Sequence, residues 1–200
     1  MKKIKTFLLI LFPVLSFSQS PIIDIQDYYG DDISGVYYKD INNLLNIYEG
    51  TYVYTNGNEM FKIVLVKKIM QYNTLYYEDL IIGAYQYVVN GVERVNTLPQ
   101  LDTVYTNQRR HSIDGSSLID NNNRQWRCPE CNPNEKRLSA NIADVSTDRH
   151  AKLFLRRMTL NGQQVMKIKI SRASGGTYDA SVGPQPGFSL RVGEFTMIKQ

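Results

Sequence analysis

The stretch that decides the fold is "TYVYTNGNEMFKIVLVKK", residues 51–68. Two runs of strand-forming residues flank Asn56-Gly57, and Asn-Gly tolerates the positive φ angles of a type I′ turn, whose twist matches the strands beside it. The pair recurs in similar contexts at Asn90-Gly91, between "AYQYVV" and "VERVNTL", and at Asn161-Gly162, between "LFLRRMTL" and "QQVMKIKI". Three such hairpins predict an antiparallel, mainly β fold.

Alternation of residue types indicates which face of each strand points inward. In residues 166–170 methionine and isoleucine alternate with lysine, whereas residues 61–66 are apolar enough to be buried on both faces near the strand centre. We expect further strands within residues 72–82, within 136–146 and at the C-terminal "GEFTMIKQ". A short helix is expected near residues 40–49, capped by Asp40 and ended by a glycine.

Residues 19–200 suit one domain with a sizeable core. The hairpin pattern predicts about eight strands in up-and-down order, closed into a barrel or packed as a sandwich. Residues 99–150 are rich in Asn, Ser, Asp and Arg, and "HSIDGSSLIDNNNRQ" within them has the composition of turns. We expect this segment to be the irregular part of the domain.

Residues 1–18, "MKKIKTFLLILFPVLSFS", have the pattern of a secretory signal peptide. Three lysines precede an apolar run that is too short to span a bilayer, and Ser16 and Ser18 stand where cleavage requires small residues. The sequence therefore predicts export to the periplasm or the medium, with no membrane span.

The charge is small overall but unevenly distributed. The chain has 23 basic and 19 acidic residues, and removal of the three lysines in residues 1–18 leaves +1, too little to favour nucleic acid or a membrane surface. Residues 101–200 nevertheless carry 15 basic and 9 acidic residues. Either this half forms an ordinary solvated face, or it carries an anion-binding face made of Arg109, Arg110, Arg124, Arg127 and Arg137.

The only two cysteines form Cys128-Pro129-Glu130-Cys131. A thioredoxin-type redox centre needs a helix at the first cysteine within a βαβ unit, and no such pattern surrounds this one. A zinc site would need His111, His150 or carboxylates as further ligands, and neither histidine has the paired spacing of a zinc finger or ribbon. In an exported protein, the pair is best interpreted as a local disulfide. We expect no metal and no cofactor.

Two resemblances accompany these patterns. A short helix followed by "EGTYVY" and then hairpins resembles the opening of lipocalin and calycin barrels, with Gly-x-Tyr in place of Gly-x-Trp. The signal exit "FSQ", "NIYEGTYVY", "YYEDLIIGAYQYVVNG" and the closing "GEFTMIKQ" resemble a family of exported proteins from Bacteroidetes bacteria. The second resemblance covers most of the chain after the signal peptide and implies no activity.

No complete set of catalytic residues is present. Ser116 lies outside any Gly-x-Ser-x-Gly elbow, and Glu78 and Asp79 are adjacent on one strand, so their side chains point to opposite faces. We therefore expect a monomeric, non-catalytic binding or interaction module whose partner is a small hydrophobic molecule or an envelope component. If the fold is a barrel, the expected ligand-binding residues are Tyr52, Phe61, Tyr85 and Tyr87. The alternatives are a secreted hydrolase that uses His111 or His150, and a structural envelope protein.

Overall fold

The computed structural model describes residues 20–28, 30–174, 181, 183 and 187–200. Residues 1–18, which carry the expected signal peptide, lie outside the described residues. Eleven strands of the described chain form one sheet, and eight of them close into an antiparallel barrel. The all-β prediction is confirmed, and of the two arrangements that the sequence left open the protein adopts the barrel.

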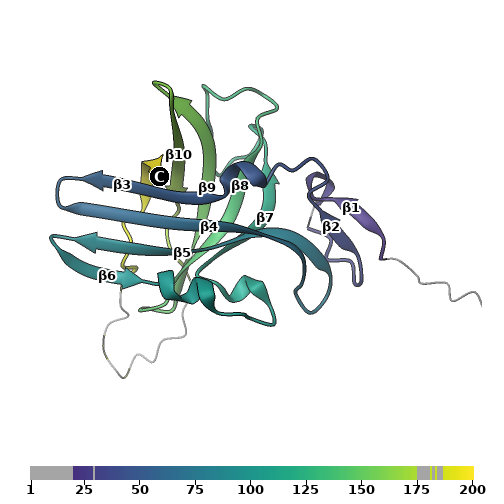
Figure 1. The fold of residues 1–200 in the computed structure, drawn as a ribbon, viewed down its shortest axis with the longest axis horizontal. Helices are drawn as coiled ribbons and strands as arrows, with labels where there is room; N and C mark the ends of the chain where they lie inside the picture. The colour runs from purple at the N-terminus through teal and green to yellow at the C-terminus, as the bar shows by residue number, and fades with distance from the viewer. Residues whose placement is uncertain (1–19, 29, 175–180, 182, 184–186) are drawn as a thin grey trace, which may run out of the picture.

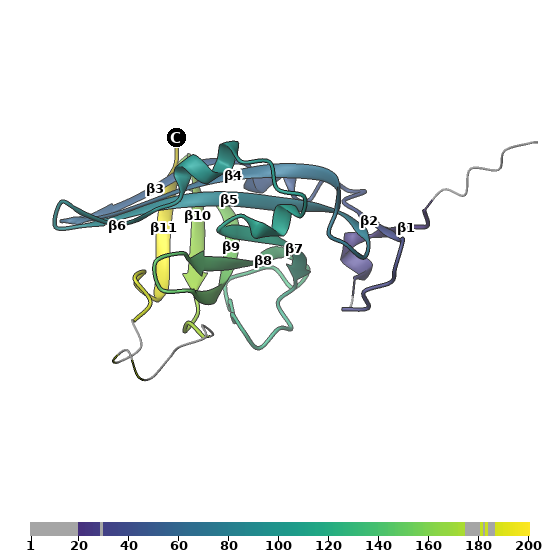
Figure 2. The ribbon, with the colours of Figure 1, turned by 90° about the horizontal axis from the view of Figure 1, so that it is seen from below.

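The barrel follows the order β5–β4–β3–β11–β10–β9–β8–β7, and β7 then pairs with β5 to close it. Figure 1 shows β3, β4 and β5 running across the view and β7–β10 crossing them steeply, and Figure 2 shows these groups as two layers. The short strands β1 and β2 extend the sheet beyond the N-terminal end of β5 through parallel pairing, and β6 pairs with the other end of β5. The strands are β1 (Ile22–Asp24), β2 (Tyr37–Lys39), β3 (Gly50–Asn56), β4 (Glu59–Tyr72), β5 (Tyr77–Val89), β6 (Val92–Asn96), β7 (Ile113–Ile119), β8 (Arg137–Asp144), β9 (Arg149–Leu160), β10 (Gln163–Ile170) and β11 (Gly193–Lys199).

The three predicted hairpins are present. Both residues of Asn90-Gly91 and of Asn161-Gly162 have positive φ, as a type I′ turn requires. The first hairpin differs in detail because Asn56 is the last residue of β3 and only Gly57 of this pair has positive φ. The turn therefore lies one residue later than the sequence pattern predicts.

The barrel interior is filled by side chains that alternate inward along the strands. Met166, Ile168 and Ile170 of β10 are at most 1% exposed, which confirms the inward face expected there. On β4, Phe61 is buried, whereas Val64 on the opposite face is half-buried. The expectation that β4 is buried on both faces is therefore only partly met.

The prediction of a helix near residues 40–49 is wrong, because this segment contains only a 3₁₀ turn. The chain forms only a 3₁₀ turn, η2 (Asn46–Tyr48), because Asn43 adopts a left-handed φ of 56° that interrupts an α-helix. Asp40 does not cap η2, whose N-cap is Leu45 without a side-chain hydrogen bond, but its carboxylate accepts the backbone N–H groups of Leu44 at 2.7 Å and Leu45 at 2.9 Å just before the turn. The described residues also form the short helical turns η1 (Ile25–Asp27), η3 (Leu98–Asp102) and η4 (Gln108–Arg110).

The segment expected to be irregular contains two barrel strands. Strand β8 lies where the sequence predicted one, but β7 occupies residues that had been interpreted as turns. Its Gly115 faces Ala140 of β8, and a Cβ atom placed there would lie 2.6 Å from the Cα of Ala140. Tertiary packing thus explains a glycine that local sequence suggests is a turn residue.

The same kind of close approach occurs where the barrel closes. Gly83 of β5 pairs with Ile113 of β7, and an added Cβ would lie 2.6 Å from the carbonyl oxygen of Val64 on β4. Distances under 3 Å mean that backbone or core side chains would have to shift. Closure of the barrel therefore requires glycine, which has no side chain, at positions 83 and 115.

We predict that Gly83→Ala and Gly115→Ala each lower the free energy of unfolding by about 1–3 kcal/mol, the usual cost of overpacking a core. Chemical denaturation monitored by circular dichroism measures the loss. Gly187→Ala is the matched control because an added Cβ there meets no atom within 4 Å. Equal stabilities for all three variants would show that the glycines do not determine closure.

Candidate functional site

The four aromatic residues expected to bind a ligand lie in the packed core. Tyr52, Phe61 and Tyr85 are fully buried, and Tyr87 is 4% exposed. The ring of Phe61 meets those of Tyr85 and Tyr87 edge-on, at centroid distances of 5.9 and 5.7 Å. The Tyr85 hydroxyl donates to the carbonyl oxygen of Ala143 at 2.8 Å. These side chains fill the space that a ligand would occupy inside the barrel.

The five arginines of the expected anion face occupy three separate places. Arg109 and Arg110 form the end of η4, and Arg124 and Arg127 lie in the loop that follows β7. Arg137 is completely buried at the start of β8. The structure therefore brings the first two pairs to different hollows and gives Arg137 a separate role.

A hollow of about 360 Å³ on the outside of the barrel brings both histidines together. We call it the histidine hollow. It is lined by Arg109, Arg110, His111, Asp114, Asn141, Ala143 and His150. The register of the sheet explains the convergence, because Asp114 of β7 pairs with Asn141 of β8, and Ala143 of β8 pairs with His150 of β9.

His111 has an unsatisfied polar atom. The residue is 3% exposed, its Nε2 lies 3.3 Å from the Gln108 amide oxygen, and its ring meets Tyr105 edge-on. Its Nδ1 is buried and has no hydrogen-bond partner among the described residues. A buried nitrogen without a partner costs free energy that a bound ligand could recover.

A buried ionic network forms one wall of the histidine hollow. The Arg109 guanidinium donates two hydrogen bonds of 2.5 Å to the Glu78 carboxylate and one of 2.9 Å to Asp114. The Ser116 hydroxyl donates to Glu78 at 2.8 Å and accepts from Arg109 at 2.9 Å. Arg109 is thus fixed in position and neutralised, whereas Arg110 is exposed, with its guanidinium 5.6 Å from the centre of the Tyr105 ring.

The pKa values of His111, Asp114 and Arg109 are shifted from their ordinary values. Burial, and then the charge of Lys68, lower the pKa of His111, which favours the neutral imidazole. Burial raises the pKa of Asp114, although Arg109 and Asn141 oppose this shift. Burial works against the charge of Arg109, but Glu78 and Asp114 outweigh it and raise the pKa of the guanidinium. Such perturbations in a concave site are typical of functional sites.

The geometry does not provide a serine nucleophile. A hydrolase of this type needs a serine hydroxyl within about 3 Å of a histidine base. The Ser116 hydroxyl instead bonds Glu78 and Arg109, and the hydrogen-bond partner of His111 is Gln108. Histidines, arginines and an amide side chain that converge without a nucleophile are better suited to holding an anion.

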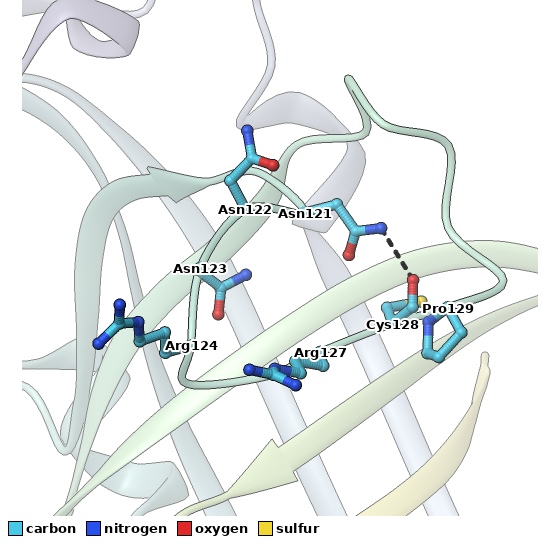
Figure 3. Close-up of a pocket in the computed structure, with 7 residues that line it drawn as sticks. All are labelled: Asn121, Asn122, Asn123, Arg124, Arg127, Cys128 and Pro129. Atoms are coloured by element: carbon cyan, nitrogen blue, oxygen red, sulfur yellow. Dashed lines mark hydrogen bonds between the residues drawn. The ribbon is translucent and has the colours of Figure 1, made fainter.

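The loop of residues 120–136 carries a second hollow, of about 330 Å³. This loop hollow is lined by Asn121, Asn122, Asn123, Arg124, Arg127, Cys128 and Pro129, and Figure 3 shows both guanidinium groups on the side away from the cysteine. The expected disulfide joins Cys128 and Cys131. The Asn121 amide donates to the carbonyl oxygen of Cys128 at 2.9 Å, so side chains within the loop reinforce its shape.

Arg137 anchors this loop to the barrel. Its guanidinium donates to the carbonyl oxygens of Trp126 at 2.6 Å and Asp120 at 3.1 Å, and its carbon lies 5.2 Å from the centre of the Trp126 ring. The Trp126 indole N–H donates to Glu194 of β11 at 2.9 Å, and its ring packs near Phe154 of β9. The loop is therefore held against the outer face of the barrel.

The described part of the chain shows neither a cluster of metal ligands nor a membrane-spanning helix. Within it, no group of three or more His, Cys, Asp or Glu residues could hold a metal ion. None of the helices described there is long and apolar enough to cross a membrane.

Sequence reasoning missed two residues that complete the histidine hollow. Asp114 lay in a stretch interpreted as turns, and Asn141 lay in a strand to which no function was assigned. Glu78, considered only as a possible hydrolytic carboxylate, instead holds Arg109. Only the pairing of β7 with β8 brings these groups together, and the local sequence does not reveal that pairing.

We predict that Cys128→Ser together with Cys131→Ser lowers the free energy of unfolding by no more than about 2 kcal/mol, because the closed loop is very short. The fluorescence of Trp126, the only tryptophan, should shift to longer wavelength if the loop loosens. Arg137→Met should produce a larger shift, since it leaves two loop carbonyl oxygens without their donor. A larger effect of the double serine variant would mean that the disulfide, and not Arg137, is the main anchor.

The comparisons with known proteins place the chain in a family without assigning a function. Neither a curated protein nor a solved structure matches it. A family described as Family of unknown function (DUF6705) matches residues 1–200. Since this match spans the whole sequence, the chain belongs to that family of unknown function.

Proposed function

We propose that this protein is an exported, non-catalytic binding module that holds an anionic ligand in the histidine hollow on the outside of its barrel. The observation that carries the proposal is the unpartnered, buried Nδ1 of His111 in a hollow lined by two arginines and two histidines. A bound carboxylate, phosphate or sulfate oxygen would supply an acceptor to a protonated His111.

The charges around the hollow support an anion. Asp114 is its one acidic lining residue, and Arg109 already pairs with it at 2.9 Å. Arg110 and His150 are exposed and point to no carboxylate among the described residues. Lys152 adds a further positive charge at the rim, because its ammonium donates to Asn141 at 2.8 Å. Hydrogen bonds between such cations and an anion are the stronger kind.

Export is part of the proposal. It is supported by the lysine-led apolar run of residues 1–18, by the resemblance to exported Bacteroidetes proteins, and by the disulfide, because disulfides persist in oxidising compartments.

We predict that Arg110→Gln and His150→Gln each weaken binding of a small anion about tenfold, the usual cost of losing one charged hydrogen bond. Isothermal titration calorimetry with inorganic phosphate and with a small dicarboxylate measures the change. Arg94→Gln is the matched control, because it removes the same charge from an exposed position on β6. Unchanged binding in the Arg110 and His150 variants would refute the hollow as the site.

We also predict that binding takes up a proton. Burial and Lys68 lower the pKa of His111 in the free protein, and an anion at Nδ1 would raise it again by stabilising the charged ring. Affinity should therefore increase as the pH falls below about 6.5, the ordinary pKa of histidine. Calorimetry in two buffers of different ionisation enthalpy detects the proton, and His111→Gln should abolish the uptake. Affinity that is independent of pH would contradict this role for His111.

A further inference from the structure

We infer that the histidine hollow is one end of a continuous cationic track whose ligand is a linear acidic polysaccharide, an extension that rests on the proposed function. The track consists of three hollows that follow one another around the outside of the barrel. The histidine hollow and the loop hollow are its ends. Between them lies a strand groove of about 480 Å³, lined by Gln125, Lys152, Phe154, Lys169, Ile170, Ser171, Arg172, Val192 and Gly193.

Two hydrogen bonds join the three hollows. The Lys152 ammonium of the strand groove donates to Asn141 of the histidine hollow at 2.8 Å. The Lys169 ammonium donates to the carbonyl oxygen of Gln125 at 2.9 Å, and Gln125 directly follows Arg124 of the loop hollow. From His150 to Phe154, β9 alone extends about 13 Å at 3.3 Å per residue. The whole track is therefore longer than a small anion.

Apart from Arg109, which pairs with Glu78 and Asp114, the lysines and arginines along the track lack carboxylate partners, whereas other cations of the protein have them. Arg156 pairs with Glu130 and Glu135, and Lys167 pairs with Glu130 and Glu194. Within the described chain, no ion pair involves the other six lysines and arginines that line the track, which are Arg110, Arg124, Arg127, Lys152, Lys169 and Arg172. Glu194 lies across from Lys169 in the sheet but bonds Trp126 and Lys167 instead.

The spacing of these charges suits a polymer of repeated anionic units. Lys152 on β9 and Lys169 on β10 are diagonal neighbours, for which side-chain separations of about 7–8 Å are usual. Arg172 lies beside them in the strand groove, and the two arginines of the loop hollow follow. An extended chain with one charge per unit can contact several of these cations at once, and this multiplies its affinity.

The uncharged lining of the track indicates a carbohydrate. The amides of Asn121, Asn123 and Asn141 are already hydrogen-bonded within the protein. The exposed amide of Asn122 forms no hydrogen bond among the described residues, so it can both donate to and accept from sugar hydroxyls. In the strand groove, the exposed side chain of Val192 is available to the apolar face of a sugar ring.

The same lining does not favour a nucleic acid. Bound single strands are usually stacked on exposed aromatic rings. The only aromatic residue lining the three hollows is Phe154, which is 2% exposed, and Trp126 of the loop is 3% exposed. Bases would therefore find no ring to stack on along the described part of the track.

The experiment measures binding of galacturonate as monomer, dimer, tetramer and octamer to the full chain after export. We expect affinity to increase at least about tenfold from dimer to octamer and to fall steeply with added salt. Arg124→Gln with Arg127→Gln should reduce octamer affinity at least about tenfold and leave monomer affinity unchanged, because the monomer occupies the histidine hollow. Lys39→Gln with Arg94→Gln removes equal charge from two exposed positions away from the track and should change neither affinity.

Other results would overturn the inference. If the monomer binds and the Arg110 and His150 variants weaken it, but affinity does not rise with length, the track is refuted and the proposed function stands. Equal or tighter binding of a DNA oligonucleotide of matched charge, weakened by the same loop variants, would replace the polysaccharide with nucleic acid. No binding of any galacturonate oligomer would refute the polysaccharide, and the phosphate and dicarboxylate titrations would then decide the proposed function separately.

Discussion

The fold depends on the contact between β5 and β7, where a sheet of hairpins becomes a closed barrel. Gly83 and Gly115 allow this contact, because a side chain at either position would strike the neighbouring backbone. The contact also builds the candidate site. Since side chains alternate along a strand, the pairing that turns Ile113 into the core turns Asp114 outward to Arg109 and Asn141. Barrel closure and the wall of the histidine hollow thus follow from one register.

Some basic side chains on the surface are paired with carboxylates and others are not, depending on which of them the carboxylates contact. Glu78 is 1% exposed, and burying its carboxylate without a cation would cost free energy. Arg109 pairs with this carboxylate, so its charge is partly neutralised and less of it is available to an incoming anion. Glu130 and Glu194 likewise bind Arg156 and Lys167. Six basic residues of 101–200 that form no ion pair within the described chain lie along the track, and Arg149, Arg157 and Lys199 elsewhere also form none.

The features that depend on neighbouring residues in the sequence could be predicted, whereas those that depend on strand pairing and its register were missed. The turns at Asn90-Gly91 and Asn161-Gly162 and the alternation in β10 depend on neighbouring residues, and all were predicted correctly, whereas the turn at Asn56-Gly57 lies one residue later than predicted. The left-handed φ of Asn43, which replaces a helix with a 3₁₀ turn, was not predicted. Strand β7, whose Gly115 resembles a turn residue, was missed because this glycine packs against Ala140 of β8, a tertiary contact. His111 and His150 could be selected by residue type alone. Their meeting in one hollow depends on two successive strand pairings, of β7 with β8 and of β8 with β9, that no local pattern specifies.

Because the interior of the barrel is filled by side chains, the proposed ligand is placed on its outer surface. An eight-stranded barrel is just wide enough for its own side chains, and here Tyr52, Phe61 and Tyr85 occupy that space. Binding on an open outer surface needs groups that are already held in position, because a flexible loop would lose entropy on binding. The loop of residues 120–136 meets this need through its disulfide, its asparagine bonds and the buried Arg137. In the proposed track, this support holds the backbone that carries Arg124 and Arg127 beside the strand groove.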